Sequence, residues 1–225
     1  MDDLIFQHEG LVFDHAEGKF ETLHEFLSLS AENLLKEHAE YVDFHNKQQK
    51  NYPLILDDLY NEDYTDFYLT GLGKYGNTFP RMLLYSIMIM ACSLFESNIK
   101  LTYKVMNHFS ATKLKWDDLR GTVVDKTIKL LKDIGLNVKD EKETMEKFRN
   151  YHMIRNCIVH NNGEIQEYRY KDKLLKYANE LGLVSSAYDE PILELTRDYC
   201  NEVCDDFMFF FSGLSINYSS RRKNK

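Results

Sequence analysis

The chain has 225 residues, of which 44% are hydrophobic and 28% charged, and its formal net charge is −8 at pH 7. This composition excludes a disordered chain, and the acidic balance argues against a protein that coats nucleic acid through a broad basic face. Only ten glycines and three prolines occur, whereas an all-β protein needs frequent turn residues. We therefore expect a single all-α domain over residues 1–225.

Two segments precede the expected core. Residues 20 to about 50 carry apolar positions at helical spacing with charges between them, which predicts a long amphipathic helix. The following residues, to about 79, include Pro53 and three glycines, so an irregular segment around 51–79 is expected, with one short helix around 54–60. Residues 1–79 are thus interpreted as an N-terminal helix and connection.

A central helix opens the predicted core, which covers residues 80–211. Pro80 suits the first turn of a helix, and the run from Arg81 to about His108 is apolar on most sides. Its most apolar part, residues 83–95, is shorter than the roughly 20 residues that a bilayer requires, so we expect a buried helix and no membrane contact. Its expected buried positions are Leu84, Ile87, Met90, Ala91 and Leu94. Its polar positions form one narrow stripe, made of Ser86, Ser93, Glu96, Ser97, Lys100 and Lys104.

Further helices follow along the chain. Asp117 and Asp118 precede a helix to Lys132, which Gly135 closes, and Glu141 to His160 form the next, stopped by Asn161-Asn162-Gly163. A short helix is predicted over about 170–181, and a last one from near Pro191 carries the aromatic cluster at 207–211. Residues 212–225 end in several cations and are expected to form a basic flexible tail.

The cysteines and the N-terminus indicate the cellular compartment in which the protein is located. The four cysteines are scattered in apolar surroundings, which predicts free thiols in a reducing compartment. Cys200 and Cys204 lie one helical turn apart, but no further ligand stands near them in sequence, so core packing is favoured and no metal or other cofactor is expected. The N-terminus has acids where a signal peptide would be basic, so we expect a cytoplasmic protein.

Polar residues of an unusual kind occupy one face of the helix from Glu141. Arg149, His152, Asn156 and His160 follow at intervals of three, four and four residues and so share a face, with Arg155 beside it. The other side is apolar and is expected to face the core through Phe148, Tyr151, Ile154 and Ile158. A solvated helix face is usually filled with Lys and Glu. This face instead carries Arg, His and Asn, and it precedes the pair Ile158-Val159, which we expect to be buried. The choice of residues therefore indicates a function.

The segment Arg155-Asn156-Cys157-Ile158-Val159-His160 resembles the Arg-x4-His signature of the HEPN (higher eukaryotes and prokaryotes nucleotide-binding) family. In that family the signature lies at the end of a late helix of an all-α bundle. Ser93-Leu94-Phe95-Glu96 is similar to the family's earlier helix, which bears a polar or acidic residue facing the Arg-His pair. The resemblance covers roughly residues 80–210 and implies a HEPN-like bundle with additional helices, whose catalytic residues are Arg155, His160, Asn156 and Glu96.

The resemblance implies a metal-independent endoribonuclease, acting as a toxin or antiviral defence effector, with an antitoxin or regulatory protein as a possible partner. The family pairs two copies of the motif helix, which implies a homodimer with a composite site. The residue types suit this reaction: His exchanges protons near neutral pH, and Arg matches phosphate geometry. Attack by the ribose 2′-hydroxyl would leave 2′,3′-cyclic phosphate and 5′-hydroxyl ends.

Other interpretations remain open at this point. A non-catalytic HEPN module would bind nucleotide, RNA or a partner protein. In a toxin subgroup partnered by a nucleotidyltransferase, a Tyr follows the motif His by two positions, whereas this chain has Asn162. Residue by residue, His160 could be a helix C-cap, Asn156 a structural hydrogen-bonding group, Glu96 an ion-pair partner of Arg155 or Arg149, and His152 an auxiliary base or an ordinary surface histidine.

Because the chain is acidic overall, any contact with nucleic acid must be local. One cluster of basic residues lies in mid-chain and consists of Lys100, Lys104, His108, Lys113 and Lys115.

Overall fold

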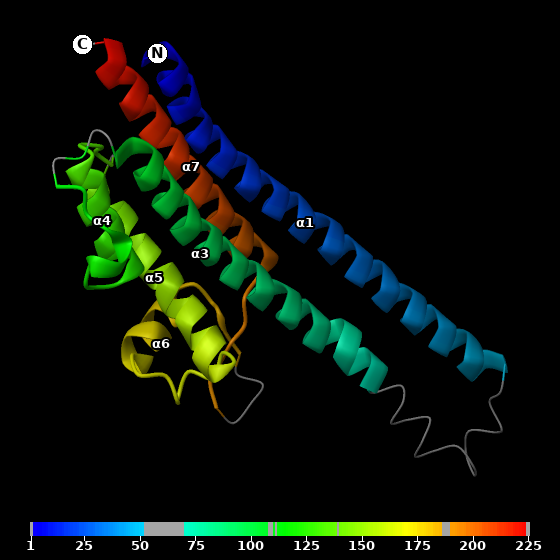
Figure 1. Cartoon of the computed structure of the whole chain (residues 1–225). Helices are drawn as coiled ribbons and strands as arrows, with labels where there is room; N and C mark the ends of the chain where they lie inside the picture. The colour runs from blue at the N-terminus through cyan, green and yellow to red at the C-terminus, as the bar shows by residue number, and fades with distance from the viewer. Residues whose placement is uncertain are drawn as a thin grey trace.

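The computed structural model of the chain describes residues 2–51, 70–107, 110, 112–138, 140–185 and 190–223. It is mostly helical, with six α-helices and 80% helix, which confirms the all-α class. Three long helices form one layer: α1 (Asp2–Asn51), α3 (Phe79–Met106) and α7 (Arg197–Lys223) contact one another pairwise and run side by side in Figure 1. Both termini lie at the same end of this layer (Figure 1).

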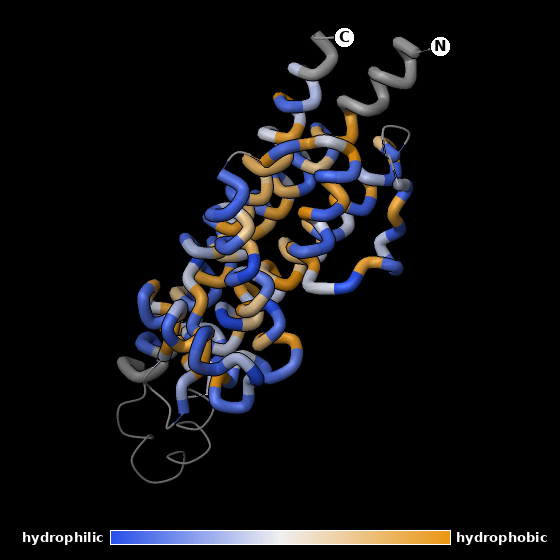
Figure 2. Tube along the Cα trace, turned by 90° about the vertical axis from the view of Figure 1, so that its left-hand side faces the viewer, coloured by the Kyte–Doolittle hydropathy of each residue, from blue (hydrophilic) through white to orange (hydrophobic). Residues whose placement is uncertain are grey.

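Helix α1 begins well before residue 20, where we expected it to start. Its apolar stripe extends toward the N-terminus through Val12, Phe13 and Ala16, which are buried together with Phe20 and Leu23 against the other long helices. This stripe recurs every three or four residues, so the whole segment is one amphipathic helix. Figure 2 shows the same alternation of hydrophobic and hydrophilic positions along the helices.

The second half of α1 packs against the segment that leads into α3. Residues 70–78 are helical and include a π-helix, η1 (Lys74–Thr78), so the irregular segment expected here is wrong for these nine residues. A Cβ at Gly71 would lie 2.1 Å from the Tyr41 ring, and the Tyr41 and Tyr75 ring centroids are 5.8 Å apart. Glycine at this position thus allows the two helices to approach closely. The short helix expected around 54–60 lies outside the described residues.

A second group of shorter elements covers the other side of α3 (Figure 1). It contains η3 (Trp116–Asp118), α4 (Val123–Asp133), α5 (Glu141–Asn161), α6 (Lys171–Glu180) and a two-stranded antiparallel sheet of β1 (Val184–Ser185) and β2 (Ile192–Leu193).

Because Pro191 leads into β2, α7 begins at Arg197 rather than near Pro191. Residues 212–223 continue α7, with Leu214 and Tyr218 buried, so the flexible tail is wrong over this range.

Aromatic side chains fill the centre of the core. The Phe95 ring lies 4.6 Å from that of Phe207 and 5.1 Å from that of Phe148, so α3, α5 and α7 meet there. The expected burial of Ile87 and Ala91 is confirmed, as is that of the apolar side of α5, whereas Leu84 and Leu94 are only partly buried.

Two residues expected in the core are exposed. Met90 is 44% exposed because it lies on the solvent-facing side of α3, together with the exposed Ser86, Ser93 and Ser97. Val159 is also 44% exposed, since only its neighbour Ile158 faces the core. Val159 lies next to the motif residue His160, which gives the surface at the end of α5 an apolar component.

The stretch Thr70–Met106 is long and apolar enough to cross a membrane by length and composition alone. In this structure it is the central helix, and side chains along α3 are buried against α1, α5 and α7. A core helix and a membrane span share these properties, so the stretch by itself decides nothing about membrane association.

Candidate active site at the end of helix α5

A cavity of about 340 Å³ lies beside the motif segment. Helix α5 contributes Arg155 and Asn156, and α3 contributes Glu96, so three of the four predicted catalytic residues share this cavity. The start of α4 and the segment leading into α6 close its other sides. Its full lining is Cys92, Ser93, Glu96, Thr122, Val123, Val124, Arg149, His152, Met153, Arg155, Asn156, Tyr168, Tyr170 and Lys173. Its size is that of a small-ligand pocket.

The end of α5 is fixed by its terminating residues. Asn162 has φ 50° and Gly163 has φ 84°, and the N–H of Gly163 donates to the carbonyl of Cys157. A Cβ at Gly163 would lie 2.0 Å from the hydroxyl of Tyr85, which donates to the Leu193 carbonyl. The predicted stop at Asn161-Asn162-Gly163 is therefore confirmed, and only glycine fits its last position without rearrangement.

Arg155 lies in the cavity without a carboxylate partner among the described residues. Its Nη1 donates to Asn156 Oδ1 at 2.9 Å, and a hydrogen bond between Asn156 and the Tyr168 hydroxyl accompanies this contact. A guanidinium carries five N–H donors, so most of those of Arg155 remain for an oxygen-rich ligand.

Arg149, two turns earlier on the same helix, shows the opposite arrangement. Its guanidinium pairs with Asp125 at 3.1 Å and with Glu146 at 3.3 Å. Asp125 in turn forms a capping box with Thr122 at the start of α4, which lowers the pKa of this carboxyl. Arg149 therefore joins α5 to α4 and is occupied by structural contacts.

Glu96 faces the cavity from α3 but is not the ion-pair partner of either arginine. Its carboxylate lies 2.6 Å from the Lys100 ammonium, one helical turn away. The expectation of a pair with Arg155 or Arg149 is therefore wrong, because Arg149 is held by Asp125 and Glu146 and Glu96 by Lys100. Glu96 remains at the edge of the cavity, where its carboxylate can accept a hydrogen bond.

His152 is part of the cavity wall rather than an ordinary surface histidine. Its ring centroid is 6.0 Å from that of Phe95, and its Nε2 is buried with no hydrogen-bond partner among the described residues. Burial, reinforced by the charge of Arg155, lowers the pKa of His152 to about 4, although Glu96 opposes the shift. The imidazole is therefore neutral at physiological pH.

His160 does not line the cavity. It lies in the last turn of α5 and is exposed, next to the exposed Val159. The structure thus brings Arg155, Asn156 and Glu96 together and leaves the motif histidine on the surface at the helix end.

The sequence did not indicate several residues of the cavity. Tyr168, Tyr170 and Lys173 follow the end of α5, and Thr122 precedes α4, so no periodicity connects them with the motif. Arg149 and His152 could be anticipated, because they share a helix face with Asn156.

The cysteines are all buried free thiols, and among the described residues no group of three or more His, Cys, Asp or Glu could hold a metal.

No protein-family model, curated protein or solved structure matches this chain in comparisons with known proteins.

Proposed function

We propose that the protein is a metal-independent endoribonuclease of the HEPN type, with Arg155, Asn156, Glu96 and His160 in its active site. The observation that carries the proposal is the guanidinium of Arg155, which occupies a cavity without a carboxylate partner among the described residues. A partly buried cation without a counterion attracts an anion, and the phosphodiester of RNA supplies one.

Each residue has a role in the proposed reaction. A base removes the proton of the ribose 2′-hydroxyl, the 2′-oxygen bonds to phosphorus, and the bond to the 5′-oxygen breaks as that oxygen takes a proton from an acid. His160 serves in proton transfer, and Arg155 stabilises the charge that develops on the phosphoryl oxygens. Asn156 holds Arg155 in position through its 2.9 Å contact, and Glu96 accepts a hydrogen bond at the cavity edge.

A second copy of the chain completes this site. His160 is exposed outside the cavity, so within one chain its imidazole and Arg155 are not gathered in one pocket. A two-fold contact at the end of α5 would place two such ends together, and the exposed Val159 provides apolar area for the contact. We expect light scattering to show a dimer, and Val159→Glu to give a monomer with little activity. A monomeric wild type at all concentrations would contradict the composite site.

The reaction is tested with purified protein, RNA and EDTA. We expect cleavage to survive the chelator, to leave 2′,3′-cyclic phosphate and 5′-hydroxyl ends, and to spare DNA, which lacks the nucleophile. The Arg155→Ala, His160→Ala double variant is the control for a contaminating nuclease. If the wild type leaves RNA intact, or if the double variant cleaves equally well, the nuclease assignment is wrong.

The second candidate is a non-catalytic HEPN module that binds nucleotide, RNA or a partner protein. The position of His160 outside the cavity favours it, since one chain then has an anion-binding pocket without the motif histidine. Binding of RNA without cleavage would select this candidate. A role as toxin or defence effector and an antitoxin partner rest on the family resemblance, whereas cytoplasmic location rests on the acidic N-terminus and the scattered cysteines; all three remain proposals.

A further inference from the structure

Positive charge is concentrated in one part of the chain. Residues 100–132 contain eight Lys or Arg against three Asp, a net charge of +5, whereas the whole chain carries −8. Such segregation in an acidic protein confines attraction for polyanions to one surface.

The structure assembles this segment into one surface beside the cavity. Lys126 Nζ donates to the carbonyl of Trp116 at 3.3 Å, and Lys129 Nζ donates to that of Arg120 at 3.0 Å, so α4 and the preceding loop lie against each other. The Trp116 ring lies 4.8 Å from the ammonium of Lys100 and 5.1 Å from that of Lys126. We call the cations of this surface the basic strip: Lys100, Lys113, Lys115, Arg120, Lys126 and Lys129.

Contacts hold the loop of the basic strip at its other end. The carboxylate of Asp133 accepts hydrogen bonds from Tyr103, Ser110 and Thr112. Because α4 and α3 both hold this loop, its cations are presented on a defined surface rather than on a free chain.

The basic strip begins at the edge of the cavity. Lys100 pairs with Glu96, and Glu96 and Thr122 both line the cavity, so the strip touches it from α3 and from the start of α4. Asp125, the acid on this part of α4, is already paired with Arg149. Three of the strip cations, Lys113, Lys115 and Arg120, are exposed, and no acidic partner is found for them among the described residues.

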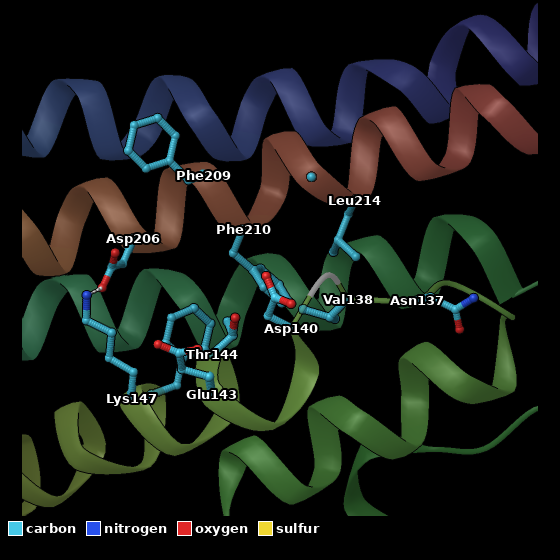
Figure 3. A pocket seen from close by; sticks show the side chains of 12 residues that line it. Asn137, Val138, Asp140, Glu143, Thr144, Lys147, Asp206, Phe209, Phe210 and Leu214 are labelled. Atoms are coloured by element: carbon cyan, nitrogen blue, oxygen red, sulfur yellow. Dashed lines mark ion pairs between the residues drawn. The ribbon is translucent and has the colours of Figure 1, made fainter.

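A second cavity, of about 400 Å³ between α5 and α7, has the opposite electrostatic character (Figure 3). Asp140, Glu143 and Asp206 line it, and its one lysine, Lys147, points at Asp206. Carboxylates repel phosphate, so an RNA strand that leaves the first cavity is directed to the basic strip and not to this one.

We propose that the basic strip binds the phosphates of the RNA that flanks the nucleotide held in the cavity. This inference rests on the proposed function, because it takes the occupant of the cavity to be a nucleotide of RNA. A cavity of about 340 Å³ has no room for a duplex, so the bound strand is single-stranded where it enters, as in loops or unpaired ends. The substrate is therefore an RNA with several nucleotides on one side of the cleaved bond.

The test reverses three exposed charges. The strip variant carries Lys113→Glu, Lys115→Glu and Arg120→Glu. The matched control carries Lys36→Glu, Lys47→Glu and Lys74→Glu, which are all exposed and lie on α1 and η1 rather than on α4 or the loop before it. Binding of a single-stranded 20-nucleotide RNA is measured at several salt concentrations in a His160→Ala background, and thermal unfolding confirms that each variant is folded.

We expect the strip variant to bind this RNA ~10-fold or more weakly, while the control variant binds as the parent does. The slope of log affinity against log salt should fall by roughly 2, since three phosphate contacts are lost at about 0.7 each. With His160 restored, the strip variant should cleave the long RNA more slowly than wild type and cleave a dinucleotide at the wild-type rate.

Distinct results separate the two proposals. If RNA affinity falls equally in both variants, or in neither, the proposal of the basic strip is wrong. The nuclease proposal still holds in that case, provided that the wild type cleaves RNA. If RNA binding depends on the strip but the wild type cleaves no RNA, the nuclease proposal is wrong and the proposal that the strip binds RNA still holds. If polyglutamate of equal charge binds as tightly and with the same dependence on the strip, the surface is a general polyanion site and the assignment to RNA is wrong. A parent that binds no RNA overturns both proposals.

Discussion

The two halves of α5 carry similar residue types with different partners. In the first half, Lys147 pairs with Glu202 and Asp206, and Arg149 pairs with Asp125 and Glu146. In the second half, Arg155 has only an amide partner among the described residues, and the buried Nε2 of His152 has none. The charged groups of the first half are thus held by carboxylates, whereas the guanidinium of Arg155 in the second half is open to a ligand.

The two cavities beside α5 show the same division. The one at the first half is lined by three carboxylates, of which Asp206 already pairs with Lys147, as Figure 3 shows. The one at the second half contains Arg155 and adjoins the basic strip. Polar residues on one helix therefore do not indicate a binding site by themselves. A charged side chain without an oppositely charged partner among the described residues, such as Arg155, does indicate one.

His160→Ala tests the second half most strongly. Loss of a proton-transfer group should lower the rate of RNA cleavage by ~100-fold or more, and because His160 is exposed the melting temperature should not change. Single-turnover cleavage and thermal unfolding measure the two quantities, with the exposed His15→Ala on α1 as control. A rate equal to that of the control would contradict the role given to His160.

Gly163→Ala tests how firmly the end of α5 is held. The new Cβ would meet the Tyr85 hydroxyl at 2.0 Å and would require a φ of 84°, so we expect a loss of about 2 kcal/mol in unfolding free energy. Gly182→Ala is the matched control, since it has φ 66° and open space around it, and it should cost about 1 kcal/mol. Equal costs in urea unfolding would show that Tyr85 does not restrict this position.

Asp133 should make the structure sensitive to acid. Burial raises the pKa of its carboxyl, but hydrogen bonds from Ser110, Thr112 and Tyr103 outweigh burial and lower the pKa to about 2. The folded pKa is depressed, so the stabilisation is fully present above about pH 4 and is lost as the pH falls toward 2.

We expect this contribution to be about 1 kcal/mol, because solvent screens the carboxylate. Urea unfolding of wild type and Asp133→Asn at pH 6 and pH 3 measures it. A difference between the two proteins that does not shrink at the lower pH would contradict the assignment.

Arg149→Gln should have the smallest effect. Its ion pairs are partly exposed, so we expect a loss of at most about 1 kcal/mol in unfolding free energy and a cleavage rate within a few-fold of wild type. A large loss of cleavage with intact stability would give Arg149 a role in the reaction and would remove the distinction between the two halves of α5.

Local patterns in the sequence predicted much of this structure. The all-α class, the central helix, the apolar side of α5 and its stop at Asn161-Asn162-Gly163 all follow from helical periodicity and terminating residues. The helical course of residues 70–78 and the extension of α7 were missed, because long-range packing, such as that of Gly71 on Tyr41, overrides local signals. The early start of α1 was also missed, although its apolar positions continue the helical spacing toward the N-terminus.

The candidate site was predicted less completely. Helix periodicity placed His152 beside Asn156, and resemblance selected Arg155 and Glu96, which the structure brings to one cavity. Tyr168 and Lys173 could not be predicted, since only the tertiary fold brings them there. The sequence also could not show that Arg149 has carboxylate partners from two elements whereas Arg155 has none among the described residues, which is the feature that separates the halves of α5.

The most direct test of this division is the cleavage rate of one RNA by Arg155→Lys and by Arg149→Lys, measured side by side. A lysine keeps the charge but not the planar fork, so Arg155→Lys should lose at least ~10-fold in rate, while Arg149→Lys should stay close to wild type. Equal rates for the two variants would contradict the claim that the end of α5 is reserved for a phosphate ligand.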